Sequence, residues 1–104
     1  MSAMVSDVIY ARTAERDKER IVAYLLYERE DPRAAQRFLA GLDHMVENLS
    51  RMQEMYPRAA DGRAAEAGYR NAGFASYVAL YRIVGDAVEI DRVFHAKQDY
   101  ARLL

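Results

Sequence analysis

The sequence predicts an α+β fold in which an antiparallel two-helix hairpin packs on a small, mainly antiparallel sheet. Two long segments in the first half carry apolar side chains at spacings of three and four residues, which is typical of amphipathic helices. The second half carries short runs rich in β-branched and aromatic residues, and glycine-containing turns separate them. The predicted order is β-α-α-β-β-β, with a short C-terminal helix. At 104 residues the chain is expected to form a single domain over residues 1–104.

The first strand is expected over Val5–Tyr10, a short β-branched run flanked by polar residues. A helix is expected to follow over Ala14–Arg29, with Thr13 as its N-cap. Its apolar positions, among them Ile21 and Leu25, gather on one face.

The sequence Glu30–Asp31–Pro32 indicates a break between two helices. Asp31 is expected to cap the second helix, and Pro32 suits its first position because no backbone donor is needed there. The apolar residues between Ala35 and Met52 then recur at helical spacing, and Pro57 is expected to end the helix. So short a break predicts that the two helices form an antiparallel hairpin.

After a loop over residues 57–66, three strands are expected, over 67–72, 76–84 and 87–94, with a short closing helix over 97–104. Gly85–Asp86 fits a two-residue hairpin turn with glycine at its first central position. Pairing Val84 with Ala87 across this turn places Tyr81 opposite Ile90 and Tyr77 opposite Phe94. It also places Arg92 on the apolar face, where it needs a partner unless the register differs. Tyr69, Tyr77 and Tyr81 are expected to pack in the core; stacking on nucleic-acid bases is the alternative.

Composition narrows the possible functions. The net charge of −1 and the pI of about 6.1 give no general attraction to nucleic acid, so direct DNA binding by this chain is not expected. The absence of cysteine excludes disulfides and thiolate metal sites, and it suits a reducing compartment. The first ten residues do not resemble a signal peptide, and no stretch is apolar for long enough to cross a bilayer. We therefore expect a cytoplasmic protein without membrane partners.

No metal or cofactor is expected either. The chain has two histidines, His44 and His95, and neither has a second histidine at the spacing of a metal site. Glycine-rich phosphate loops and nucleophile motifs are absent.

Four stretches together resemble the RelE/ParE superfamily, the toxins of bacterial type II toxin–antitoxin pairs. They are Tyr10–Asp17 at the entry to the first helix, Gly68–Arg70, Ser76–Arg82 with its tyrosine-arginine ending, and Val88–Tyr100, which is similar to the final strand and closing motif of the family. Their order and spacing cover nearly the whole chain. The resemblance implies the fold described above, a cognate antitoxin as partner and a hetero-oligomer with it.

The superfamily contains RelE-like members, which cleave messenger RNA on the ribosome, and ParE-like members, which act on DNA gyrase. This chain is closer to the ParE-like members, because its net charge is −1 and because Val78 and Gln98 stand where RelE-like enzymes carry basic residues. The resemblance therefore implies a growth inhibitor that binds a target such as DNA gyrase. The alternatives are a ribosome-dependent ribonuclease and an interaction module of this fold that has lost toxicity.

Two sets of residues are candidates for function. If the chain is a ribonuclease, we expect His95 and Lys97 to act with Arg70, Arg82 and Tyr100. If it binds a target, the end of the last strand is the expected surface. Alternatively, His95 and Asp99 form a structural hydrogen bond. The target-binding candidates are Arg92, His95, Lys97, Gln98, Asp99 and Tyr100.

The helix hairpin is expected to carry more apolar residues than a small sheet can cover. Val22, Leu26, Met45, Met52 and Met55 are expected to lie partly exposed and to bind the antitoxin, whose disordered C-terminal segment would fold on them. The alternatives are ordinary core packing and a homodimer through the hairpin.

Overall fold

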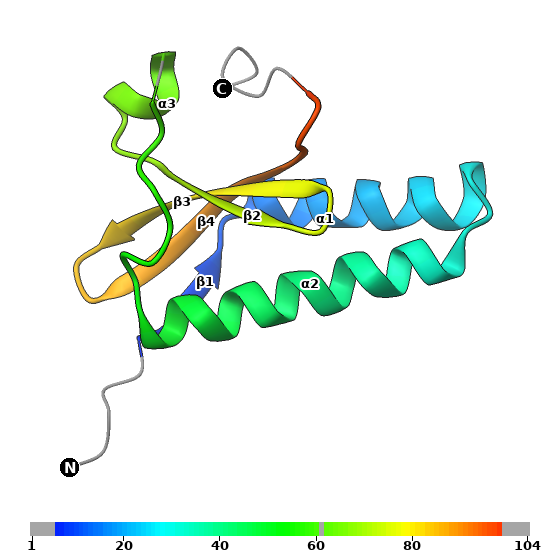
Figure 1. The fold of residues 1–104 in the computed structure, drawn as a ribbon, viewed down its shortest axis with the longest axis horizontal. Coiled ribbons are helices and arrows are strands. Elements are labelled where there is room, and N and C mark those ends of the chain that lie inside the picture. The colour runs from blue at the N-terminus through cyan, green and yellow to red at the C-terminus, as the bar shows by residue number, and fades with distance from the viewer. Residues whose placement is uncertain (1–5, 61, 99–104) are drawn as a thin grey trace.

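The computed structural model describes residues 6–60 and 62–98, and it has the expected α+β architecture. Two long antiparallel helices lie along one face of a four-stranded sheet (Figure 1). The strand order is β1-β4-β3-β2, in which β1 runs parallel to β4 and the other pairs are antiparallel. The elements are β1 (Val8–Tyr10), α1 (Arg12–Ala23), the π-helical turn η1 (Tyr24–Glu28), α2 (Pro32–Arg51), α3 (Gly62–Glu66), β2 (Arg70–Phe74), β3 (Tyr77–Val84) and β4 (Ala87–His95).

The start of the first helix differs from the prediction. α1 begins at Arg12, two residues earlier than expected, and its N-cap is Ala11 without a side-chain cap. Thr13 is not the cap. Its hydroxyl donates instead to the backbone carbonyl of Asp91, 2.6 Å away. The Thr13 side chain, which was expected to cap the helix, therefore binds the sheet instead.

The second helix begins as predicted but ends early. The Asp31 carboxylate accepts a hydrogen bond from Ala34 N at 3.0 Å, and Pro32 occupies the first turn. The helix ends at Arg51, well before Pro57, because the following chain is held by the sheet. The Gln53 carbonyl accepts the Tyr81 hydroxyl at 2.7 Å, and the Gln53 side chain donates to the Asp86 carbonyl at 2.9 Å.

The segment expected to be a loop contains α3 and also covers part of a sheet edge. Asn71 N donates to Pro57 O, and Ala59 N donates to Tyr69 O, both at 2.9 Å. β2 lies two to three residues later than expected. It is joined to β3 by the two-residue turn Ala75–Ser76, in which Ala75 has φ of +50°. The closing helix expected over 97–104 falls mostly outside the described residues, and Lys97 and Gln98 lie in a turn.

The hairpin at Gly85–Asp86 is confirmed, and so is its register as far as Tyr81, which pairs with Ile90. Beyond that point the predicted register is wrong by one residue, because a β-bulge leaves Asp91 without an opposite residue. Leu80 pairs with Arg92, and Tyr77 pairs with His95 instead of Phe94. The bulge therefore turns Arg92 away from the helix-facing core.

The main core lies between the helices and the sheet. Its largest fully buried side chains include Phe38, Leu42, Met45 and Leu49 from α2 and Tyr81 from β3. Core packing is confirmed for Tyr81, which is 0% exposed, and Tyr77 packs edge-on against Phe38 at 4.7 Å between ring centroids. A smaller cluster on the opposite face contains Val78, Leu80 and Phe94, with Tyr69 against it.

Candidate functional site

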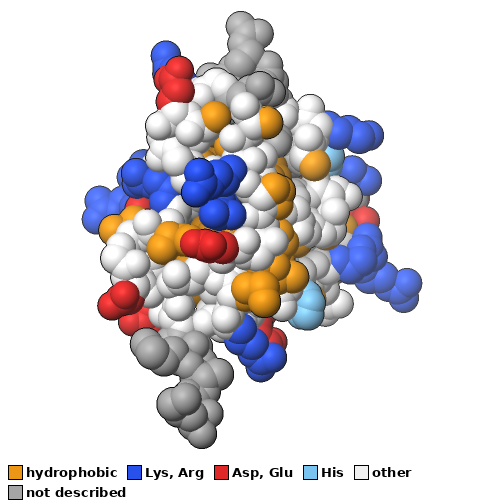
Figure 2. Space-filling view, turned by 60° about the vertical axis from the view of Figure 1, so that its left-hand side comes forward, with side chains coloured by type: hydrophobic (Ala, Val, Ile, Leu, Met, Phe, Trp, Pro, Cys, Tyr) orange, Lys and Arg blue, Asp and Glu red, His pale blue; other side chains and the backbone are white. Residues whose placement is uncertain are grey.

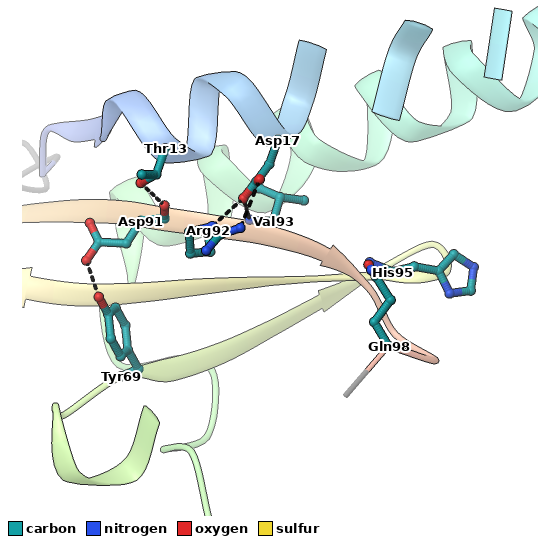
Figure 3. A network of polar contacts seen from close by, with 8 residues as sticks. All are labelled: Thr13, Asp17, Tyr69, Asp91, Arg92, Val93, His95 and Gln98. Atoms are coloured by element: carbon teal, nitrogen blue, oxygen red, sulfur yellow. Dashed lines mark hydrogen bonds and ion pairs between the residues drawn. The ribbon is translucent and has the colours of Figure 1, made fainter. Parts of the chain in front are cut away.

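Side-chain hydrogen bonds from α1, and not a second neighbouring strand, hold the edge of the last part of β4 (Figure 3). Asp17 is buried in α1, and its Oδ2 accepts hydrogen bonds from Val93 N at 2.9 Å and from Arg92 Nε at 2.8 Å. Arg92 Nη2 donates to Oδ1 of the same carboxylate at 3.2 Å, which completes a bidentate pair. The Arg92 guanidinium also lies over the Phe94 ring, 4.5 Å from its centroid. Arg92 is therefore held in place before any partner binds.

A second polar cluster surrounds Asp91 on the sheet face away from the helices. The Tyr69 hydroxyl donates to Asp91 Oδ2 at 2.6 Å, and Arg82 Nε donates to the same atom at 3.1 Å. Burial, and then the hydrogen bond to Asp91, raise the pKa of Tyr69 to about 12. Tyr69 thus remains a hydrogen-bond donor throughout the physiological range.

Glu89 adds a second carboxyl to this cluster. Its Oε1 lies 3.5 Å from Arg82 Nη2. Hydrogen bonding with the Asp91 carboxyl, followed by the charge of that carboxylate, raises the pKa of Glu89 above its ordinary value of 4.5. Asp91 Oδ1 is buried and has no hydrogen-bond partner among the described residues. A proton on Glu89 would supply a donor to the Asp91 carboxyl.

His95 ends β4 on the helix-facing side of the sheet. Its Nδ1 accepts a hydrogen bond from Lys97 N at 3.1 Å, and its ring lies edge-on to Tyr77 with centroids 5.3 Å apart. Its backbone N donates to the Gln98 side-chain oxygen at 2.9 Å, while Gln98 N donates to the His95 carbonyl at 3.0 Å. These bonds close a tight turn at the end of the strand. Asp99, the alternative partner of His95, lies outside the described residues, as does Tyr100.

The candidate ribonuclease residues that lie within the described part of the chain do not converge. Arg82 is bound in the Asp91 cluster, on the other face of the sheet from His95. Arg70 donates to the Tyr56 carbonyl at 2.8 Å and pairs along the sheet with Tyr81, whereas His95 pairs with Tyr77. Four residues of extended strand separate these two positions by about 13 Å. Lys97 is exposed in the closing turn.

A groove between the first helix and the end of the sheet contains residues that the sequence reasoning missed. It has a volume of about 440 Å³ and is lined by Arg20, Ile21, Tyr24, Leu25, Arg29, Tyr77, His95 and Gln98. An adjoining hollow shares Leu25, Arg29, Tyr77 and His95, and it extends to Arg37 on α2. The four-residue spacing of Arg20 and Tyr24 predicts that they share one face of the helix. The position of Arg29 could not be predicted, because it depends on the π turn η1.

The expected antitoxin-binding residues do not form one surface. Met45 is 1% exposed, so the expectation that it lies partly exposed is wrong; it fills the core under α2. Val22 is half-buried against the core, whereas Leu26, Met52 and Met55 are exposed. Leu26 and Met52 lie at opposite ends of the hairpin, because the 20 residues of α2 span about 30 Å. On the end of the molecule that Figure 2 shows, apolar side chains form narrow patches between charged ones.

Within residues 6–60 and 62–98, no helix is both long and apolar enough to span a membrane. The same part of the chain contains no cluster of three or more histidine or carboxylate side chains arranged to hold a metal ion.

Comparisons with known proteins agree with this architecture. A chain from the chromosomal ParDE toxin–antitoxin system of P. aeruginosa is similar, with a TM-score of 0.68 and 20% identity, over 92% of this chain and 100% of that one. A chain from the toxin–antitoxin complex RelBE2 of Mycobacterium tuberculosis gives a TM-score of 0.64 at 26% identity, over 92% and 98%. Among curated proteins there is no match. The model of the ParE toxin family, described as the ParE toxin of the type II toxin–antitoxin system parDE, matches residues 8–100. The chain therefore belongs to the ParE toxin family.

Proposed function

We propose that this type II toxin arrests growth by binding its target, for which DNA gyrase is the first candidate, and that a cognate antitoxin neutralises it. The observation that carries the proposal is the separation of the possible catalytic side chains. His95 lies on one face of the sheet, Arg82 is paired on the other, and Arg70 is bonded to the Tyr56 carbonyl.

RNA cleavage requires a base at the 2′-hydroxyl, an acid at the leaving oxygen and a cation at the phosphorane, all within hydrogen-bond reach of one phosphate. Arg82 is also neutralised by its two carboxylate partners, Asp91 at 3.0 Å and Glu89 at 3.5 Å. These contacts support a protein that acts by binding. Held by Asp17 and by the closing turn, Arg92, His95, Lys97 and Gln98 present a fixed surface at the end of β4. We propose that this surface contacts the target.

The antitoxin is proposed on two grounds. The solved structures that this chain resembles come from toxin–antitoxin systems, and one of them is a toxin–antitoxin complex. The helix hairpin also exposes a large apolar side chain at each of its ends: Tyr27, in η1, is 79% exposed, and Met52, just after α2, is 60% exposed. A segment that folds on binding gains stability by covering such side chains.

The proposal is tested with the purified protein in a gyrase supercoiling assay, beside an assay for mRNA cleavage on translating ribosomes. We expect inhibition of gyrase and no cleavage. Because His95 is one contact of the proposed target surface and not a catalytic group, His95→Ala should weaken growth arrest only partly and leave it largely intact. The matched control is His44→Ala, at an exposed position of α2.

Other results would assign other functions. Cleavage of mRNA that His95→Ala and Lys97→Ala abolish would establish a ribonuclease and overturn the proposal. Normal growth during expression without an antitoxin would indicate a module without toxicity. Growth arrest that persists when a candidate antitoxin is co-expressed would show that this candidate does not neutralise the protein.

A further inference from the structure

We propose that the groove between α1–η1 and the end of the sheet binds an acidic polypeptide segment that carries apolar side chains. The floor of the groove is apolar, formed by Ile21 and Leu25, and cationic side chains stand along it. Arg20 and Arg29 line the groove, and Arg37 lines the adjoining hollow. His95 and Gln98, which line one part of the groove, also belong to the surface proposed above for the target, so the two sites adjoin. The inference stands whether or not gyrase is that target.

The π turn creates the charged wall. In a regular α-helix, which turns by about 100° per residue, Arg29 would lie about 140° around the axis from Tyr24. In η1 the Arg29 N–H instead donates to the Tyr24 carbonyl at 3.0 Å, so Arg29 lies one wide turn beyond Tyr24 and on the same side. The turn thereby brings Arg29 to the face that already carries Arg20 and Tyr24.

The three guanidinium groups are not engaged by carboxylates. Within residues 6–60 and 62–98, neither Arg20, Arg29 nor Arg37 forms an ion pair. Among the described residues, no carboxylate lines the groove, and the two that line the neighbouring hollows are already occupied. Asp31, in the adjoining hollow, caps α2, and Asp17, beyond Arg20, is paired with Arg92. The groove is therefore locally positive in a chain whose net charge is −1.

Arginine suits this role because its planar fork binds a carboxylate with two parallel hydrogen bonds. A nucleic acid would offer phosphates to the same arginines, but of the two tyrosine rings that line the groove only that of Tyr24 is open to a base. Tyr77 already packs edge-on against Phe38 at 4.7 Å and against His95 at 5.3 Å, so its ring is not an open platform. An apolar floor beside arginines fits aliphatic side chains alternating with carboxylates.

The probe is a nine-residue peptide of three Glu-Glu-Leu repeats, titrated into the full-length protein and followed by NMR, which detects weak binding. The controls are a Lys-Lys-Leu peptide and a nine-nucleotide single-stranded RNA. The test variant is R20E/R29E. Its matched control is R12E/R16E, which reverses the same two charges on exposed positions of α1 outside the groove.

We expect the acidic peptide to shift the signals of the groove residues in the wild-type protein and in R12E/R16E. R20E/R29E should bind it at least tenfold more weakly and should gain binding of the Lys-Lys-Leu peptide. If R20E/R29E does not fold, R20Q/R29Q removes the charges without reversing them and should show the same loss. Equal binding of the acidic peptide to the wild type and the groove variant, no binding to the wild type, or tighter binding of the RNA in the groove would each overturn the proposal.

Discussion

The Asp17 carboxylate takes the place of a neighbouring strand beside Val93, whose backbone N–H it accepts at 2.9 Å. β1 pairs with β4 only as far as Ile90, where Ala11 N donates to the Ile90 carbonyl. From that point α1 supplies the partners, first the Thr13 hydroxyl to the Asp91 carbonyl and then Asp17 to Val93 N. The first two turns of the helix therefore complete the edge of β4, up to the turn that holds His95.

Asp17→Ala should destabilise the protein strongly. It leaves the Val93 N–H without its acceptor and the Arg92 guanidinium without its carboxylate. An unsatisfied buried donor and a broken, partly buried ion pair together cost about 2–4 kcal/mol. Asp17→Asn keeps an oxygen for Val93 and removes the charge, so it should cost less. Urea unfolding of the two variants measures the difference.

Asp43→Ala is the matched control, because Asp43 is exposed on α2 and forms no ion pair with the described residues. It should change the free energy of unfolding by less than about 0.5 kcal/mol. Equal stability of Asp17→Ala and the control would show that α1 does not hold the edge of β4.

The helix hairpin and the main strands were predictable because each has a local signal. Asp31 and Pro32 mark the start of α2, and Gly85 marks the turn between β3 and β4. The bulge at Asp91 depends on tertiary contacts, but the sequence carries one sign of it. The polar pair Asp91–Arg92 interrupts the alternation of apolar residues in β4. The one-residue error in register followed from reading that strand as regular.

The groove could not be predicted in the same way. Arg29 reaches it through a π turn, which no residue pattern in the helix announces. Tyr77 and His95 meet there only because of the bulge, which moves His95 opposite Tyr77. Helical spacing alone would place Arg20 and Tyr24 together and leave Arg29 elsewhere.

Glu89 should make the protein less stable as the pH rises. Its folded-state pKa is raised by Asp91 above the ordinary 4.5, so the folded state binds the proton more tightly than the unfolded chain. The resulting stability is fully present below the unfolded pKa and is lost as the pH rises through the folded pKa. The free energy of unfolding, measured between about pH 4 and about pH 7, should therefore include a term from Glu89 that decreases as the pH rises.

Glu89→Gln should remove that loss. The amide is neutral at every pH and can donate to the Asp91 carboxyl, so the variant should be more stable than the wild type at neutral pH. The partly exposed contact with Arg82 that it gives up, at 3.5 Å, is worth little. Glu19→Gln, at an exposed position of α1, should retain the wild-type pH dependence. A Glu89→Gln variant that is less stable at pH 7 and unchanged in slope would contradict this assignment.

Ala75→Gly should stabilise the protein. Ala75 lies in the β2–β3 turn with φ of +50°, a left-handed conformation that costs an L-residue about 1–2 kcal/mol. Glycine adopts it freely but loses more chain entropy on folding, so the net gain should be about 0.5–1 kcal/mol. The melting temperature should rise accordingly. Ala40→Gly, on the exposed side of α2, has no such strain to relieve and should lower it.

Met45 and Met52 offer a matched test of which methionines belong to the core and which to a surface. They lie on the same stretch of chain seven positions apart, but Met45 is 1% exposed and Met52 is 60% exposed. Met45→Ala should leave a cavity under α2 and cost about 2–4 kcal/mol, whereas Met52→Ala should cost less than about 0.5 kcal/mol. Urea unfolding checks both values. If the antitoxin covers this end of the hairpin, Met52→Ala should weaken antitoxin binding without changing the free energy of unfolding. A variant of this kind distinguishes a loss of binding from a loss of folding. Comparable destabilisation by the two changes would mean that Met52 is packed in the native protein and is not free to meet a partner.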